Sequence, residues 1–213
     1  MENYEKETIA AIATALSDSG IGIVRISGEN AIYIVDSIFR SASGKKILTK
    51  VQSHMIHYGY IVDKDENIID EVMTSVMKAP KSYTMEDTVE INCHGGVLVM
   101  QKVLETVLQA GARLAEPGEF TKRAFLNGRI DLSRAEAVID VIHSQNEYAL
   151  SSSVSQLKGR LSDKIRSLRE DILYQIAFIE SALDDPEHIS LEGYPEQLAE
   201  KVTGFEKEIQ KLL

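Results

Sequence analysis

Ten apolar residues in the second half of the chain recur at intervals of three and four positions. Their spacing repeats every 11 residues, close to 3.67 residues per turn, so the apolar stripe stays on one side of a straight helix. Residues 134–183 contain no proline, and a helix of that span would be roughly 70 Å long at 1.5 Å per residue and would need partner helices to bury the stripe. Only one further helical segment, 196–213, follows it. The spacing therefore predicts an incomplete all-α helical bundle. The stripe consists of Leu150, Val154, Leu157, Leu161, Ile165, Leu168, Ile172, Ile176, Ile179 and Leu183.

The first half of the chain has a different pattern, of short β-rich runs with two helical segments. Apolar residues at helical spacing predict helices over 29–39, with Ser27 as a cap, and over 97–111. Together these elements predict an α+β domain with a mostly antiparallel or mixed sheet. The change in pattern near Pro117-Gly118 predicts one domain over 1–118 and a helical one over 119–213. The expected strands cover 7–14, 21–28, 54–63, 68–79 and 87–93.

Composition excludes several classes of protein. Hydrophobic residues make up 44% of the 213 residues and charged residues 26%, which are ordinary globular values. No apolar run is long enough to span a bilayer, and the acidic N-terminus has no secretory signal pattern. A single cysteine, Cys93, excludes an internal disulfide and a cysteine-based zinc site. We therefore expect a cytoplasmic protein with no membrane association.

Charge is unevenly distributed along the chain. The net charge is −10, which argues against a dedicated nucleic-acid binder for the chain as a whole. Residues 119–169, however, hold 9 basic and 6 acidic residues, and the segments on either side are acidic. This basic stretch is either a set of solvated helix faces or a local surface for an anionic partner.

Common cofactor motifs are missing from the chain. Gly20-Ile21-Gly22 lacks the third glycine of a dinucleotide fingerprint, and no G-x-x-x-x-G-K-[ST] sequence occurs. Histidine and cysteine do not cluster at ligand spacing, so we expect no metal site. Cys93 alternates with apolar strand residues and is expected to be a small core residue.

Two charged residues interrupt otherwise apolar strands. Arg25 lies within IGIVRIS, and Glu90 lies on the face of DTVEINC opposite Val89 and Ile91. Each is either a solvent-facing strand residue or part of a binding site. If both lay on one face of one sheet, the carboxylate could accept paired N–H donors from a planar heterocycle with an amino-pyrimidinone edge.

Two glycine-containing turns are further candidates. His94-Gly95-Gly96 joins a strand to a helix, and its glycines would allow a ligand to approach backbone N–H groups. A tight turn without a ligand explains the same pattern. Arg129 follows Asn127-Gly128 between two helical stretches, where it could reach an anionic group or cap helix carbonyls.

Three segments together resemble the MnmE (TrmE) family of tRNA-modification GTPases. They are IGIVRISG (21–28), DTVEINCHGG (87–96) and, most specifically, PGEFTKRAFLNGRIDLSRAEAVIDVI (117–142). The resemblance continues through IESALDDPE (179–187) and covers essentially the whole chain. It implies an N-terminal tetrahydrofolate-binding and dimerisation domain, then a helical domain into which a GTPase domain is inserted.

The resemblance also implies an activity. Such proteins form homodimers and, with the flavin-dependent partner MnmG, add an aminomethyl-type or carboxymethylaminomethyl group to carbon 5 of the wobble uridine of tRNA. The one-carbon unit comes from 5-formyltetrahydrofolate or methylene-tetrahydrofolate. GTP hydrolysis with Mg²⁺ and K⁺ drives the conformational changes. Arg25, Glu90 and Arg129 match the positions that bind the folate in the family.

The chain ends before a GTPase domain and the family's C-terminal cysteine motif would begin, so no catalytic or metal-binding residue is expected in it. We therefore expect an N-terminal part of such an enzyme. Two alternatives stay open. One is a free-standing folate-dependent one-carbon transferase similar to an aminomethyltransferase. The other is a dimerisation scaffold without folate binding, since Ala15-Leu16-Ser17-Asp18-Ser19 replaces a Pro-Gly-rich stretch at the expected mouth of the site.

Overall fold

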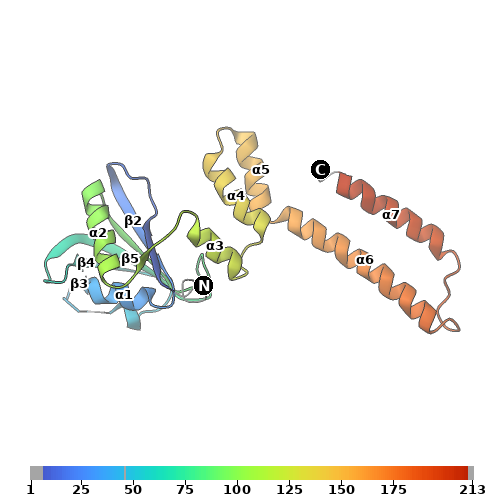
Figure 1. The fold of residues 1–213 in the computed structure, drawn as a ribbon, viewed down its shortest axis with the longest axis horizontal. Helices are drawn as coiled ribbons and strands as arrows, with labels where there is room; N and C mark the ends of the chain where they lie inside the picture. The colour runs from blue at the N-terminus through green and yellow to red at the C-terminus, as the bar shows by residue number, and fades with distance from the viewer. Residues whose placement is uncertain (1–6, 46, 211–213) are drawn as a thin grey trace. The chain divides into compact units, whose positions relative to one another are not determined.

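The computed structural model describes residues 7–45 and 47–210. They form two compact units, divided between Ile130 and Asp131. The first unit is built on a seven-stranded sheet and the second is helical (Figure 1). The α+β class is therefore confirmed. The division differs from the expected one after Gly118, because helix α3 (Glu119–Leu126) is held to the sheet unit by buried ion pairs that a change of sequence pattern does not reveal.

The strands form one mixed sheet in the order β3-β4-β5-β6-β2-β1-β7. Neighbouring strands are antiparallel, except that β7 runs parallel to β1. The expected hairpin is β4 followed by β5, while the short strands β3 and β7 were not expected. The bounds are Ile9–Ile12 (β1), Ser19–Ser27 (β2), Phe39–Ser41 (β3), Met55–Val62 (β4), Ile68–Met77 (β5), Thr88–Gly95 (β6) and Arg113–Leu114 (β7).

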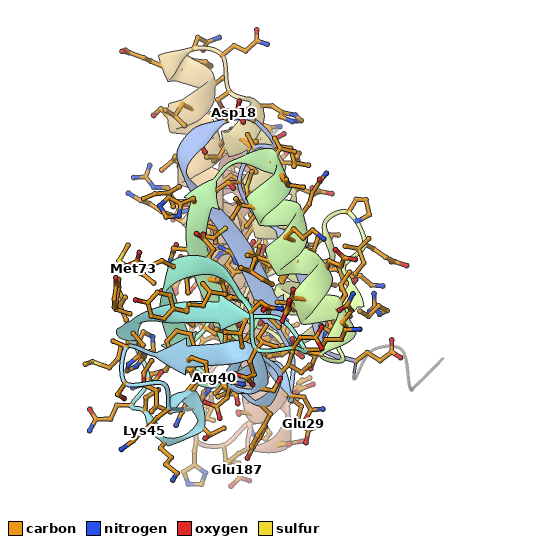
Figure 2. All side chains as sticks on the ribbon, turned by 90° about the vertical axis from the view of Figure 1, so that its left-hand side faces the viewer. Asp18, Glu29, Arg40, Lys45, Met73 and Glu187 are labelled. Carbon is orange, nitrogen blue, oxygen red and sulfur yellow. The ribbon has the colours of Figure 1, made fainter. Side chains whose placement is uncertain are left out.

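Alternation along the strands separates the two faces of the sheet. Helices α1 (Ala31–Ile38) and α2 (Val97–Gln109) cover one face (Figure 1). A short 3-10 helix, η2 (Leu48–Lys50), packs against α1. Residues between the core positions point to the opposite face: Met73 is 45% exposed and projects on the side of the sheet away from α2 (Figure 2).

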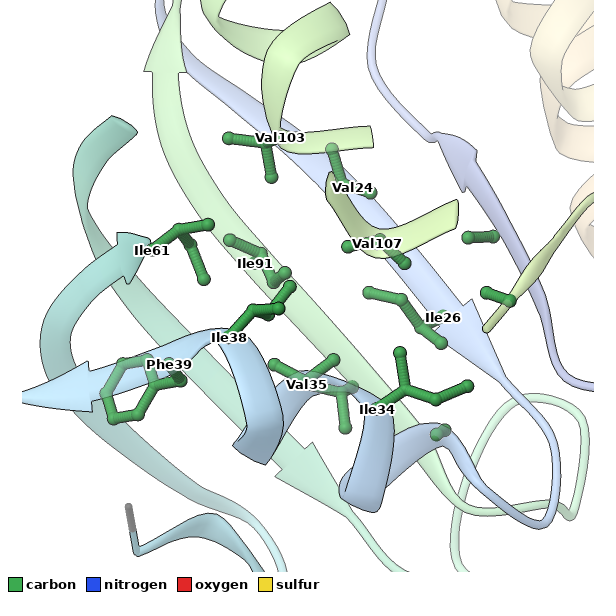
Figure 3. Packing of buried hydrophobic residues seen from close by; sticks show 14 of the residues in the cluster. Val24, Ile26, Ile34, Val35, Ile38, Phe39, Ile61, Ile91, Val103 and Val107 are labelled. Atoms are coloured by element: carbon green, nitrogen blue, oxygen red, sulfur yellow. The ribbon is translucent and has the colours of Figure 1, made fainter. Parts of the chain in front are cut away.

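The core lies between the sheet and these two helices. Val24 and Ile26 of β2 and Ile91 of β6 are fully buried, and they pack with α1 and α2 residues such as Val35 and Val107 (Figure 3). Full burial of an aliphatic side chain contributes about 1.5–3 kcal/mol, so this layer is a main source of the unit's stability. Because β2 and β6 are central strands of the sheet, this packing also fixes the residues on their other face.

Ser27 does not cap helix α1, contrary to expectation. Asn30 is the N-cap residue, without a side-chain hydrogen bond. Ser27 is buried instead, and its hydroxyl lies 2.6 Å from Thr84 Oγ1 and 2.8 Å from Glu86 Oε2. The hydroxyl therefore ties β2 to the loop before β6, where it donates to the Glu86 carboxylate instead of accepting from the N–H groups at the start of the helix.

The second unit contains two antiparallel helix pairs. Helix α4 (Leu132–His143) packs on α5 (Glu147–Leu157), and α7 (Tyr194–Gln210) returns along α6 (Arg160–Asp184) (Figure 1). The rings of Phe178 and Tyr194 lie 4.8 Å apart at one end of the second pair.

The continuous helix predicted from the apolar stripe is wrong. The chain breaks between α5 and α6 at Gly159, whose φ of +81° is left-handed. A Cβ there would also meet the guanidinium at the flexible end of Arg134, so the left-handed backbone is the main reason that the turn favours glycine. The apolar period continues across the break, which is why the stripe alone predicted a single helix.

Much of the stripe remains exposed on α6. Ile165, Ile172 and Ile176 are 42–53% exposed, and an apolar groove of about 490 Å³ runs between α6 and α7. This agrees with the expectation of an incomplete bundle. Within the described residues, no helix is long and apolar enough to cross a bilayer.

Candidate functional site

Arg25 and Glu90 form a cross-strand ion pair on the sheet face away from α1 and α2. They are direct partners in the register of β2 and β6. Nε and Nη2 of Arg25 each lie 2.7 Å from Oε1 of Glu90. The side chains are 30% and 20% exposed, and Oε2 of Glu90 has no partner among the described residues. A half-buried carboxylate oxygen is thus free to accept a hydrogen bond.

Two aromatic rings lie beside this pair. The guanidinium carbon of Arg25 is 5.6 Å from the ring centre of Tyr83 and 5.7 Å from that of Phe120. The guanidinium carbon of Arg129 is 4.8 Å from the Tyr83 ring centre. These are cation–π distances. The structure therefore brings the three residues expected from the sequence, Arg25, Glu90 and Arg129, together around one aromatic side chain.

The loop that carries Tyr83 is fastened to α3. The Tyr83 hydroxyl lies 2.9 Å from Oγ1 of Thr121 on that helix. Nδ2 of Asn127 donates to the carbonyl of Thr84 at 2.7 Å. Gly128, with φ +77°, then reverses the chain so that Arg129 follows directly. The Asn127-Gly128 turn therefore positions Arg129 against Tyr83.

A buried ionic cluster anchors α3 itself. Arg123 contacts Glu86 at 3.2 Å and Glu119 at 3.0 Å, and it donates to the carbonyl of Glu7 at 2.8 Å. Arg113 contacts the same Glu119 carboxylate at 2.7 Å. Burial alone would raise the pKa of Glu119, but hydrogen bonds from Arg113, from the Glu116 backbone N–H and from Arg123 outweigh it and hold the pKa at about 2. Glu119 is therefore charged at neutral pH.

Sequence reasoning missed the two aromatic residues and this cluster. The i, i+4 spacing of Glu119 and Arg123 permits a helical ion pair but gives no sign of its burial. Tyr83 lies in a loop without periodicity, so no local pattern indicated its place beside Arg25.

The other candidates are not part of this site. Nδ1 of His94 lies 2.7 Å from Asp70 Oδ1, and hydrogen bonding to that carboxylate raises the pKa of His94. Gly95 lacks room for a side chain because Ser19 lies against it, and neither Gly95 nor Gly96 has a positive φ. Cys93 is buried on the core face, as expected. Close packing against Ser19 therefore explains Gly95.

The cluster of Arg25, Glu90, Tyr83, Phe120 and Arg129 has the groups of a binding site. It offers a carboxylate acceptor, two guanidinium groups and two aromatic faces, which suit a planar heterocycle that also carries negative charge. No group of three or more His, Cys, Asp or Glu side chains able to hold a metal ion occurs within residues 7–45 and 47–210.

Comparison with known proteins gives the family. The family described as "GTP-binding protein TrmE N-terminus" matches residues 8–129, and the family "MnmE helical domain" matches residues 132–213. The chain belongs to the MnmE (TrmE) family. The two matched segments meet at the same place as the two compact units, between Ile130 and Asp131.

Curated MnmE relatives are similar over nearly the whole chain. A tRNA modification GTPase MnmE of Lachnoclostridium phytofermentans is 61% identical over 207 residues, covering 97% of the chain. Those of Bacillus subtilis and Geobacillus kaustophilus are 51% and 54% identical over 97% and 98% of it. The chain spans slightly less than half of the length of these relatives, 45–46%, and corresponds to their N-terminal part. It is thus related to tRNA-modifying GTPases without containing a G-x-x-x-x-G-K-[ST] sequence.

Proposed function

We propose that the first unit binds a tetrahydrofolate that carries a one-carbon unit, and that it does so within a homodimeric tRNA-modification GTPase. The observation that carries this proposal is the cross-strand pair of Arg25 and Glu90, in which Oε2 of Glu90 has no partner among the described residues and the Arg25 guanidinium lies beside the ring of Tyr83.

The chemistry of a reduced folate fits these side chains. Its amino-pyrimidinone edge presents N–H donors, which Glu90 would accept at a half-buried carboxylate. Tyr83 and Phe120 supply apolar faces for the flat pterin ring. Arg25 and Arg129 supply positive charge for the carboxylates of the folate tail. The bound 5-formyl- or methylene-tetrahydrofolate would supply the one-carbon unit.

The remaining activity involves the whole protein. We propose that, with the flavin-dependent partner MnmG, it installs an aminomethyl-type or carboxymethylaminomethyl group at carbon 5 of the wobble uridine of tRNA, coupled to GTP hydrolysis with Mg²⁺ and K⁺. The names of the relatives support the tRNA-modification part.

Exposed apolar residues support dimerisation through the first unit. On the sheet face away from the helices, Tyr58 of β4 is the register partner of Met73 of β5, and the neighbouring Ile56 is 65% exposed. Tyr58 and Met73 are 52% and 45% exposed. A contiguous apolar surface of this kind is typical of protein–protein contacts.

Calorimetric titration with 5-formyltetrahydrofolate tests the folate proposal. Arg25→Ala should weaken binding about ten-fold or more, as expected for the loss of a charge-assisted contact. Lys78→Ala removes the same charge from a side chain that makes no hydrogen bond or ion pair within the described residues, and it should change the affinity less than two-fold. Absence of heat with the unmodified chain, or equal effects of the two variants, would contradict folate binding; a dimer in light scattering without folate binding would then favour the scaffold alternative.

A further inference from the structure

We propose that the junction of α5 and α6 in the helical unit binds the phosphate backbone of RNA. A hollow of about 810 Å³ lies here, and its lining includes serines of α5, basic side chains at the start of α6, and one residue of α7. The residues that matter are Ser151, Ser152, Ser155, Arg160, Lys164 and Glu208. All of them belong to the second unit, whereas the proposed folate site lies in the first.

Positive charge at this junction is only partly neutralised. Five basic residues lie between positions 158 and 169, against a single acidic one, Asp163. Lys164 pairs with Glu208 at 2.7 Å, and Arg166 lies 3.7 Å from Asp163. Lys158, Arg160 and Arg169 are exposed and have no ion pair among the described residues. Arg160 lines the hollow and Lys158 lies two residues before it, and unpaired cations grouped in this way attract an anion.

Neutral donors line the same hollow. Ser153 turns its hydroxyl back to the carbonyl of Ala149 at 3.0 Å, as serines inside helices commonly do. The hydroxyls of Ser151, Ser152 and Ser155 make no hydrogen bond within the described part of the chain. Ser151 and Ser155 are one turn apart, and with Glu147, Lys158 and Arg160 they line an adjoining hollow of about 300 Å³. Hydroxyl donors interleaved with Lys and Arg form a typical set of phosphate contacts.

A nucleic acid fits these features better than a free phosphate ion. The two adjoining hollows spread the donors along α5 and the start of α6, and no single deep pocket gathers them. Tyr148 lines the larger hollow with its side chain 86% exposed, which offers a face on which an unpaired base could stack. The choice of RNA over another polyanion rests on the proposed role in tRNA modification. The acidic segments on either side would limit binding of RNA elsewhere on the chain.

The test measures binding of an unmodified tRNA transcript by fluorescence anisotropy at several salt concentrations. Lys158→Gln/Arg160→Gln should weaken binding about ten-fold and reduce the slope of log K against log salt by about 2, because two phosphate contacts are lost. Lys45→Gln/Lys50→Gln removes the same charge from exposed positions of the first unit. It should leave the tRNA affinity within about two-fold and the salt slope unchanged.

Tyr148→Ala separates stacking from charge: it should weaken tRNA binding about ten-fold with an unchanged salt slope. The affinity of the same variants for 5-formyltetrahydrofolate should be unchanged. A failure of the folate proposal is therefore distinguishable from a failure of the RNA proposal. Equal tRNA binding by the two double variants would overturn the inference. Equal competition by inorganic polyphosphate and by tRNA would overturn the assignment to RNA.

Discussion

Arg123 and Glu119 form a buried ion pair one turn apart on α3, with Nη2 3.0 Å from Oε1 and side chains 6% and 9% exposed. The same guanidinium reaches Glu86 in the loop before β6. This contact joins a helix that looks, by sequence pattern, like the start of the helical domain to the sheet unit. It also holds the loop that carries Tyr83, so the geometry of the candidate site depends on it.

Arg123→Met should destabilise the first unit by about 3 kcal/mol, because removing one partner of a buried pair leaves the other charge poorly compensated. Urea unfolding of the sheet unit at pH 7 measures the loss. Lys122→Met is the matched control: Lys122 is the exposed neighbour on the same helix, and its substitution should cost less than about 0.5 kcal/mol. Similar stability of the two variants would show that the buried ionic cluster contributes little to the stability of the first unit.

Stability of the first unit should fall with acid through the titration of Glu119. Its pKa in the folded chain, about 2, lies below the ordinary value of 4.5. The stabilisation is therefore complete above about pH 4.5 and is lost as pH falls from there toward 2. Glu119→Gln should be less stable at pH 7 and should show a shallower loss over this window in urea unfolding. Asp131→Asn, in the other unit, should leave the acid profile of the sheet unit unchanged; a profile unaltered by Glu119→Gln would contradict the assignment.

Gly159→Ala should loosen the start of α6. The left-handed conformation costs a side-chain-bearing residue about 1–2 kcal/mol, and the guanidinium of Arg134 would have to shift. Hydrogen exchange of the α6 amides should accelerate. Gly204→Ala, in the exposed middle of α7 where a Cβ meets no neighbour, should instead slow exchange in its helix through a gain of about 1 kcal/mol. Changes in the same direction for both variants would refute this reading of Gly159.

Cys93 should resist alkylation in the folded protein. Burial, with a smaller effect from the negative charge of Asp70, raises the pKa of its thiol to about 11, so the reactive thiolate is scarce at pH 8. Iodoacetamide labelling followed by mass spectrometry should be slow at pH 8 and become fast after denaturation in urea. Rapid labelling of the folded chain would show that the β6 core face opens readily.

Tyr83→Ala should weaken binding of 5-formyltetrahydrofolate several-fold, since an aromatic wall of the proposed site is lost. Tyr83→Phe keeps the ring and should bind nearly as well as the unmodified chain. Tyr33→Ala removes a tyrosine that is 67% exposed on α1, on the other side of the sheet, and is the control. Calorimetric titration distinguishes them, and an unaffected Tyr83→Ala variant would argue against stacking on this ring.

Local pattern predicted most elements of the first unit. Alternation in β6 placed Val89 and Ile91 on the core face and Glu90 on the other, because the side-chain period of a strand is a property of the backbone. The spacing of apolar residues alone could not predict the helix break at Gly159. The apolar spacing continues across it, and the left-handed φ of Gly159 is a property of the folded backbone that this spacing does not report.

The sequence by itself determined the family, the α+β class, the face on which each strand residue lies, and three charged residues as candidates for the site. Only the tertiary structure decided that β2 pairs with β6 in the register that sets Arg25 against Glu90. Tertiary contacts also decided that α3 belongs to the sheet unit and that Tyr83 and Phe120 flank Arg25. The physical reason is that periodicity reports the backbone of one element, whereas pairing, buried charge compensation and loop placement depend on residues far apart in the chain.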